Sequence, residues 1–196
     1  MYGSIPFGYW LALVIKHTNV REKGSGNIGA TNITRVLGFK FGIISLLFDL
    51  SKGMFPFLIA QQLFPGQRGL ALLCSSSAII GHNFSLFLFF KGGKGIGTTL
   101  GLLLVFDWKI ALILLGIWIV TILITGWVSL GSILALCSAP LLIIQMYPAV
   151  NLQNQLVWVF VFFFSTLGIW QHRENIKRLL KHEEKVMFRH NLCKNR

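Results

Sequence analysis

Residues 110–125 read IALILLGIWIVTILIT, and this run without a charged side chain is one of about seven apolar stretches in the chain. The others are expected near residues 2–15, 41–64, 69–90, 98–106, 131–147 and 156–170. A helix needs about 20 residues to cross the hydrocarbon core of a bilayer, so the stretches at 2–15 and 98–106 are short. The pattern predicts an all-α polytopic membrane protein with about seven transmembrane helices, some of them short or half-spanning.

The composition excludes an ordinary soluble domain. The chain of 196 residues is 54% hydrophobic and only 12% charged, and its mean hydropathy is +0.68. Soluble domains carry about 25% charged residues. No linker or low-complexity tract divides the sequence, so we expect residues 1–196 to form a single integral membrane domain. No cleavable signal peptide is expected, because the N-terminal run has no basic region before it.

The distribution of basic residues predicts the orientation in the membrane. The formal net charge is +12, and most Lys and Arg residues lie in the loops after the first and third apolar stretches and in the C-terminal tail. These segments share one side of a seven-span topology, so the positive-inside rule places them in the cytoplasm, with the N terminus outside and the C terminus inside. The charge by itself fits a basic cytoplasmic face as well as it fits anionic ligands.

The cysteines give no sign of a metal or redox site. Cys74, Cys137 and Cys193 have neither the spacing of metal ligands nor that of disulfide partners, so we interpret them as packing residues or a tail thiol. No metal, cofactor or nucleic-acid partner is expected.

A glycine-rich stretch, GSGNIGATN at residues 24–32, follows the first apolar run. Its glycines allow close backbone approach, and backbone N–H groups with Ser25, Asn27, Thr31 and Asn32 can surround a phosphate. Arg35 lies on the same face as Thr31 and Asn32 if a helix begins there. The alternative is a flexible polar loop followed by a capped helix.

A second polar stretch, FKGGKG at residues 90–95, follows the third apolar run. It lacks the Gly-x4-Gly-Lys-Ser/Thr spacing of a nucleotide P-loop, so we reject nucleotide hydrolysis. Lys91 and Lys94 beside Gly93 can still hold a phosphate, although lysines at this place also fit a positive-inside flank. His82, in the sequence GHNF at 81–84, is typical of a packing or interfacial residue.

The third stretch, HRENIKRLL at residues 172–180, follows the last apolar run. On a helix His172, Asn175 and Arg178 share one face, which then presents an imidazole, an amide and a guanidinium. A basic amphipathic helix lying on anionic lipid is the alternative.

Other polar residues lie closer to the membrane interior. Asp49 and Lys52 are three residues apart within the second apolar run, where an unpaired charge is costly, so we expect them to face each other or a polar cavity, and we prefer the pair. Ser129 and Ser132 flank the uncharged fifth loop and can reach the same cytoplasmic pocket.

These three polar stretches, in this order on a basic chain with about seven apolar runs, resemble the bacterial acyl-phosphate:glycerol-3-phosphate acyltransferase family known as PlsY. The resemblance covers almost the whole chain and implies a multi-pass enzyme of the bacterial inner membrane with a cytoplasmic active site. Such an enzyme transfers a fatty acyl group from acyl phosphate to glycerol 3-phosphate. It gives 1-acyl-glycerol 3-phosphate and phosphate, the first step of phospholipid synthesis, without acyl-CoA or a metal, and works among membrane lipids.

The resemblance also implies roles for individual positions. His172 and Asn175 correspond to catalytic residues. The implied substrate-binding positions are Ser25, Asn27, Thr31, Asn32, Arg35, His82, Lys91, Gly93, Lys94, Ser129, Ser132 and Arg178. The chain departs from the family pattern at Ser85, at residues 125–127 and at His182, and its first apolar run is short.

Two alternatives remain from the sequence. A transporter for an organic anion also needs cations near broken spans, but no inverted repeat is visible and the polar stretches share one side. A structural scaffold leaves the glycine–lysine pattern unexplained. Acyl-chain preference, oligomeric state and the proton acceptor, either His172 or a phosphate oxygen of the substrate, do not follow from the sequence.

Overall fold

The computed structural model describes residues 1–148 and 150–187, without the side chains of residues 152 and 153. The expected tail thiol Cys193 lies outside the described residues. The described part has helices and no strands, which confirms the predicted all-α class. Its helices long and apolar enough to cross a membrane are α3 (Phe39–Leu63), α4 (Arg68–Asn83, with the turn up to Leu88), α6 (Trp108–Thr125), α7 (Val128–Met146) and α8 (Leu152–Gln171).

Two shorter apolar helices match the two runs expected to be short. They are α1 (Phe7–Lys16) and α5 (Ile96–Phe106). At about 1.5 Å per residue, neither reaches across a hydrocarbon core about 30 Å thick. Apolar side chains on the long helices point outward, as expected for contact with lipid: Ile124 is 78% exposed and Leu141 is 69% exposed.

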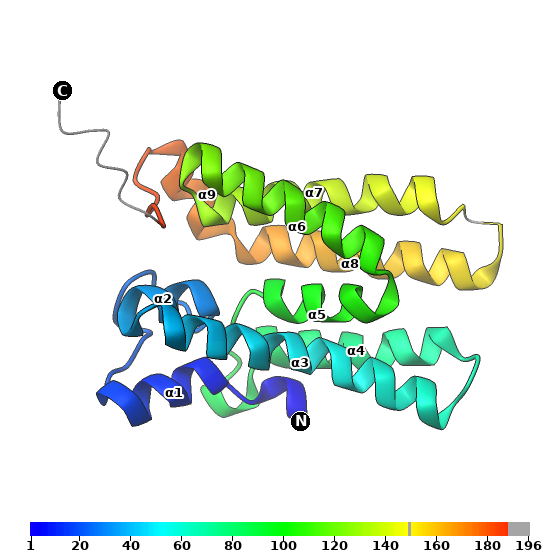
Figure 1. Ribbon diagram of the computed structural model, residues 1–196, viewed down its shortest axis with the longest axis horizontal. Coiled ribbons are helices and arrows are strands. Elements are labelled where there is room, and N and C mark those ends of the chain that lie inside the picture. Colours follow the sequence, from blue (N-terminus) through cyan, green and yellow to red (C-terminus); the bar gives the residue numbers. More distant parts are fainter. Residues whose placement is uncertain (149, 188–196) are drawn as a thin grey trace.

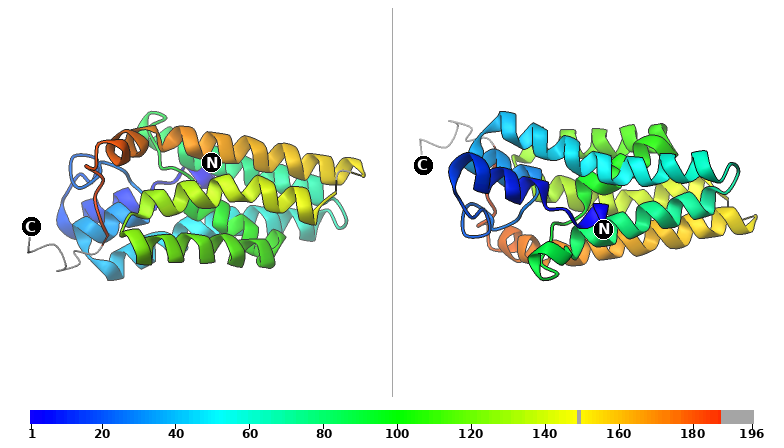
Figure 2. Two further views of the ribbon diagram at one scale, coloured as in Figure 1. Left: turned by 90° about the horizontal axis from the view of Figure 1, so that it is seen from above. Right: turned by 90° about the horizontal axis from the view of Figure 1, so that it is seen from below.

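All three polar stretches lie at one end of the bundle (Figure 1). The polar helices α2 (Ala30–Leu37) and α9 (Arg173–Leu180) lie at this end, together with the loop before α5 and the α6–α7 turn. The turns between α3 and α4 and between α7 and α8 lie at the opposite end, as the two views of Figure 2 also show. We call the end of the bundle that holds the three polar stretches the motif end.

The first apolar run differs from the prediction at its start. The expected helix from residue 2 is replaced by the short 3₁₀ helix η1 (Tyr2–Ser4), and α1 begins only at Phe7. Proline has no backbone N–H to continue a helix, and here Pro6 is the residue that precedes α1.

The third apolar run ends earlier than predicted. We expected it to reach residue 90, but α4 ends at Asn83 and is followed by the 3₁₀ helix η2 (Leu86–Leu88). The chain then folds back, because Gly92 N–H donates to the Asn83 carbonyl at 3.1 Å and Gly93 N–H donates to the His82 carbonyl at 3.0 Å. These bonds fix the polar loop against the end of α4.

Two glycines let α3 and α5 approach closely. A Cβ on Gly53 would lie 1.9 Å from the Thr98 carbonyl oxygen, and one on Gly101 would lie 2.1 Å from the Leu50 carbonyl oxygen. Any larger side chain would separate the two backbones. This contact holds the short α5, and the polar loop that leads into it, against the long α3.

Candidate active site

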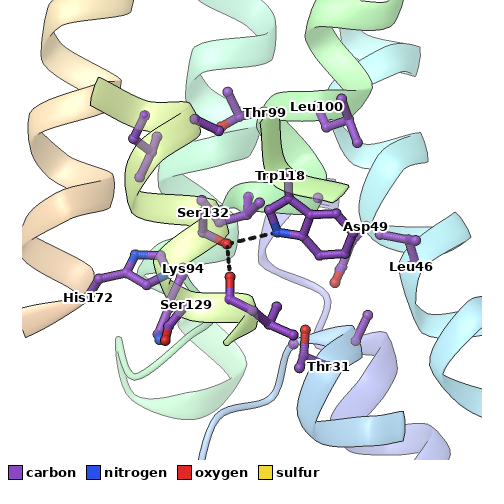
Figure 3. A pocket seen from close by; sticks show the side chains of 18 of the residues that line it. Thr31, Leu46, Asp49, Lys94, Thr99, Leu100, Trp118, Ser129, Ser132 and His172 are labelled. Atoms are coloured by element: carbon purple, nitrogen blue, oxygen red, sulfur yellow. Dashed lines mark hydrogen bonds between the residues drawn. The ribbon is translucent and has the colours of Figure 1, made fainter. Parts of the chain in front are cut away.

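One cavity of about 330 Å³ runs from the motif end into the bundle (Figure 3). Its polar end is lined by residues from the three polar stretches and from α2, α4 and α7: Ser25, Asn27, Thr31, Asn32, Arg35, His82, Lys94, Ser129, Ser132, His172 and Asn175. Its deep end is apolar and includes Ile110 and Ile143, both fully buried, with Leu114, Ala139 and Val161. The prediction that the three polar stretches meet at one pocket is confirmed.

Asn32 shapes the glycine-rich loop from inside. Its side-chain amide donates to the carbonyl oxygens of Val20, Lys23 and Asn27 at 2.8–3.1 Å, and its Oδ1 accepts the Ser25 N–H at 2.7 Å. Asn32 is only 1% exposed, so its amide stabilises the loop through these hydrogen bonds and does not contact a ligand.

The expected ring of free backbone N–H groups in this loop is only partly present. Ser25 N–H donates to Asn32, Gly26 N–H donates to the Lys23 carbonyl, and Gly29 N–H donates to Asn27 Oδ1 at 2.8 Å. These amides are already satisfied, because the loop is held by its own side chains. The side chains of Ser25 and Thr31 still line the cavity.

Arg35 brings a partly unsatisfied guanidinium to the polar end. One terminal NH2 group donates to the Lys185 carbonyl at 3.1 Å, but the buried Nε has no hydrogen-bond partner among the described residues. Burial lowers the pKa of Arg35, and so does the charge of Arg178, whereas Glu184 acts in the opposite direction. A buried N–H without a partner is costly, so an anion that accepts from it is favoured.

Lys94 is a second cation at this end, and its ammonium donates to Asn175 Oδ1. Burial, together with the nearby charges of Arg178 and Arg35, lowers the pKa of Lys94 to about 8, although Glu184 acts to raise it. The ammonium is therefore still protonated at neutral pH. Two cations lie near it, Arg178 and Arg35, against one carboxylate, Glu184.

His172 faces the same space as a neutral imidazole. Its Nδ1 lies 2.7 Å from the Gly168 carbonyl oxygen, which only accepts, so Nδ1 carries the proton and Nε2 keeps a lone pair. Burial and the charge of Lys94 lower the pKa of His172 to about 4. A cation beside a neutral imidazole suits a site that holds phosphate and orients a hydroxyl group.

Glu184 organises the site, and we did not predict it. The carboxylate accepts Ser129 Oγ–H at 2.9 Å, Asn175 Nδ2–H at 2.7 Å and Arg178 Nε–H at 2.7 Å. Burial acts to raise the pKa of Glu184, but these bonds hold it below its usual value. The carboxylate thus connects the start of α7 to α9.

A buried ionic cluster supports the Lys94 loop. Lys52 Nζ lies 2.8 Å from Asp49 Oδ1 and 3.3 Å from His82 Nδ1, which confirms the predicted Asp49–Lys52 pair. The other side of the His82 ring packs on Gly93, where an added Cβ would lie 2.1 Å from Nε2. His82 therefore connects the ionic cluster to the loop at Gly93, directly before Lys94.

Ser132 at the cavity wall is held by an indole. The Trp118 Nε1–H donates to Ser132 Oγ at 3.2 Å, and Ser132 Oγ–H donates to the Val128 carbonyl at 3.1 Å (Figure 3). Trp118 itself also lines the cavity. We did not predict Trp118, because a tryptophan within an apolar run is indistinguishable from one that faces lipid.

Three predicted positions do not line this cavity. Lys91 lines a separate cavity, Gly93 is buried under His82, and Arg178 is paired with Glu184. Lys91 and Lys94 are separated by two glycines in a folded-back loop, so their side chains leave it in different directions. Gly93 and Arg178 contact residues that do line the cavity, His82 and Glu184.

Fold and site together define a helical membrane protein in which a cationic pocket opens into an apolar groove. A sequence model of the family described as glycerol-3-phosphate acyltransferase matches residues 1–182. The chain belongs to this glycerol-3-phosphate acyltransferase family.

Similar proteins include curated relatives and solved structures. The glycerol-3-phosphate acyltransferase of Leptospira borgpetersenii serovar Hardjo-bovis (strain JB197) is 42% identical over 187 residues, which cover 93% of this chain and 85% of the relative. The glycerol-3-phosphate acyltransferase of Thermotoga petrophila is 37% identical over 183 residues, which cover 93% of this chain and 90% of the relative.

Two crystal structures of PlsY (YgiH), an integral membrane glycerol 3-phosphate acyltransferase, have the same fold. The glycerol 3-phosphate form is 37% identical with a TM-score of 0.85, and it covers 94% of this chain and 90% of its own. The lysophosphatidic acid form is 36% identical with a TM-score of 0.81, and it covers 94% and 89%.

Proposed function

We propose that this protein transfers a fatty acyl group from acyl phosphate to glycerol 3-phosphate, giving 1-acyl-glycerol 3-phosphate and inorganic phosphate. One observation carries this proposal: Arg35, Lys94 and His172 lie together at the polar end of a cavity whose other end is apolar. Both substrates carry a phosphate group, and one also carries a long apolar chain. The similar structures in glycerol 3-phosphate and lysophosphatidic acid forms support the same reaction.

The cations bind the phosphate groups. Arg35 Nε is buried without a partner among the described residues, and Lys94 has one neutral partner, Asn175. Phosphate oxygens accept strong hydrogen bonds from both groups. As the mixed anhydride breaks, the phosphate that leaves gains negative charge, and the same cations stabilise it.

The apolar part of the cavity binds the acyl chain. One face of α7 lines it from Ser132 to Ile143, a rise of roughly 16 Å at 1.5 Å per residue. Ser132 lies at the polar end of this face and Ile143 at its buried end. An extended chain in this groove places its carbonyl carbon near Lys94 and His172, where the glycerol hydroxyl attacks.

His172 orients the hydroxyl rather than removing its proton by basicity alone. The Nε2 lone pair accepts from the 1-hydroxyl of glycerol 3-phosphate, and the bond from Nδ1 to Gly168 fixes the ring. The pKa of His172 is about 4, whereas a phosphate monoester has its second pKa near 6. The proton therefore passes to a phosphate oxygen as the new ester C–O bond forms and the acyl–phosphate C–O bond breaks.

The charge distribution supports an orientation in the membrane. We propose a single-domain protein of the bacterial inner membrane whose motif end faces the cytoplasm, where glycerol 3-phosphate is dissolved. The short α1 and α5 and the five long apolar helices support a multi-pass protein, and the basic loops at the motif end support the orientation.

The decisive experiment uses purified protein in detergent. Acyl phosphate with glycerol 3-phosphate should yield lysophosphatidate and phosphate in equal amounts, whereas acyl-CoA in place of acyl phosphate should yield neither. Lys40 is exposed and does not line the cavity, so the variant Lys40→Gln should retain the activity. If reconstituted vesicles take up glycerol 3-phosphate but release no phosphate, the protein is a transporter and the proposal is wrong.

A further inference from the structure

A second cavity of about 380 Å³ lies at the motif end, outside the acyl-transfer site. It shares no lining residue with the first cavity. Three cations from three separate segments line it: Arg21 before the glycine-rich loop, Lys91 after η2, and Arg173 at the start of α9. No Asp or Glu residue is among the residues that line it.

Two of these cations have no counter-charge. Within residues 1–148 and 150–187, the side chains of Arg21 and Lys91 make no hydrogen bond or ion pair. Arg173 has an exposed contact with Glu174 at 4.0 Å and a 3.3 Å bond to the Trp170 carbonyl. An exposed pair at this distance contributes little, so the cavity keeps most of its positive charge.

A buried amide also lines this cavity. Asn83 is 3% exposed, and its Oδ1 has no hydrogen-bond partner in the part of the chain that the structure describes. The amide itself packs against the loop before α5, because a Cβ added on Gly95 would lie 2.6 Å from Asn83 Oδ1.

Exposed aromatic rings lie beside the cations. Trp170 is 50% exposed and Phe90 is 63% exposed, and the Arg173 guanidinium lies 4.4 Å from the centre of the Trp170 ring. Trp170 is near the end of α8, a helix long enough to cross the membrane. Tryptophan prefers the depth of the lipid headgroups, so the cavity opens where headgroup phosphates lie.

We propose that the Arg21–Lys91–Arg173 pocket is a second anion site, which binds a phosphate group from an anionic lipid headgroup or from free phosphate. Guanidinium groups bind phosphate with two parallel hydrogen bonds, and Lys91 adds a third cation. The site is separate from the acyl-transfer cavity and does not depend on its function.

The test removes two charges from the pocket and, in a matched control, two charges from elsewhere at the motif end. The variant is Arg21→Gln/Arg173→Gln, and the control is Lys40→Gln/Lys181→Gln. Native mass spectrometry then counts phosphatidylglycerol and phosphatidylcholine molecules retained by each protein, and equilibrium dialysis measures binding of labelled inorganic phosphate. Helical circular dichroism checks the fold; if the double variant fails this check, the single variants Arg21→Gln and Lys91→Gln replace it.

We expect the wild type and the control to retain phosphatidylglycerol in preference to phosphatidylcholine, and the pocket variant to lose this retention about tenfold or more. Retention that survives an excess of inorganic phosphate identifies a lipid headgroup site. Phosphate binding that the pocket variant loses and the control keeps, without lipid preference, identifies a free-phosphate site. Equal behaviour of variant and control in both measurements overturns the proposal.

Discussion

At the scale of single residues, the site depends on a charged lysine next to an uncharged histidine. The charge of Lys94 helps keep His172 neutral, and the bond from Nδ1 to Gly168 leaves Nε2 as an acceptor. The two groups thus share the work, because one holds phosphate and the other orients a hydroxyl. Each part can be tested separately.

Replacement of His172 tests its role as an orienting acceptor. We expect His172→Ala to lower kcat by about 10²–10³, whereas His172→Gln, whose side-chain oxygen can accept from the hydroxyl, retains a larger part of it. Steady-state rates of phosphate release with purified protein provide the measurement. Equal losses in both variants would instead indicate that the imidazole takes the proton.

The pH dependence tests Lys94. Its pKa of about 8 lies below the usual value, so the ammonium is protonated below pH 8 and loses its proton as the pH rises above it. We expect kcat/KM for glycerol 3-phosphate to fall above about pH 8. In Lys94→Arg the guanidinium stays protonated, so the fall should disappear from the range up to pH 10. An unchanged alkaline limb in this variant would assign it to another group.

Only some positions of the site residues followed from the sequence. Arg35, Lys94, His172 and Asn175 were placed correctly at one cavity, because they lie in polar stretches next to apolar helices. Lys91 was predicted at this cavity but lines another one, because the sequence does not show in which direction each lysine of a loop points. Glu184 lies in an otherwise unremarked tail segment, and only the folded chain brings it to Ser129.

At the scale of elements, the loop before α5 depends on the end of α4. Carbonyl groups of His82 and Asn83 hold the loop, and the His82 ring lies between Gly93 and the buried pair of Asp49 and Lys52. The position of this loop is therefore tied to charges inside the bundle.

Removing one charge of the buried pair should destabilise this arrangement. Lys52→Met leaves the Asp49 carboxylate without its 2.8 Å partner, and loss of one partner in a buried pair costs about 3–5 kcal/mol. The double variant Asp49→Asn/Lys52→Met should regain much of this loss. Thermal inactivation in detergent gives the ranking, and a double variant no more stable than Lys52→Met would contradict it.

Apolar runs were sufficient to predict the helices but not their ends. The positions of α3, α6, α7 and α8 agree with the sequence to within a few residues, because length and hydropathy determine a span. The break at Pro6 and the early end of α4 arise from a missing N–H group and from loop hydrogen bonds. Neither of these changes the hydropathy of the run.

At the scale of the whole molecule, the polar helices α2 and α9 lie at the motif end (Figure 2), and residues from this end line both cavities. The first cavity continues into an apolar interior, and the second opens beside Trp170. A water-soluble substrate and a membrane-borne substrate can therefore meet at one surface.

Cysteine labelling tests the orientation of this surface. With the native cysteines replaced, Lys23→Cys reports the motif end and Gln67→Cys reports the opposite end; both positions are exposed. In intact cells, a membrane-impermeant maleimide should modify Gln67→Cys but not Lys23→Cys. Both should react after the membrane is opened, and the reverse pattern in intact cells would place the active site outside the cytoplasm.

The concentration of cations at the acyl-transfer cavity also affects how the protein behaves without substrate. Three cations, Arg35, Lys94 and Arg178, surround one carboxylate, Glu184. These cations repel one another when no anion is bound in the cavity. Any multivalent oxyanion that enters acts as a counter-ion, and at a hundred times its dissociation constant it adds about 2.7 kcal/mol to the folded state. Preparations kept in phosphate or sulfate should therefore outlast those kept in chloride, and a washed sample will be the most fragile form of the enzyme.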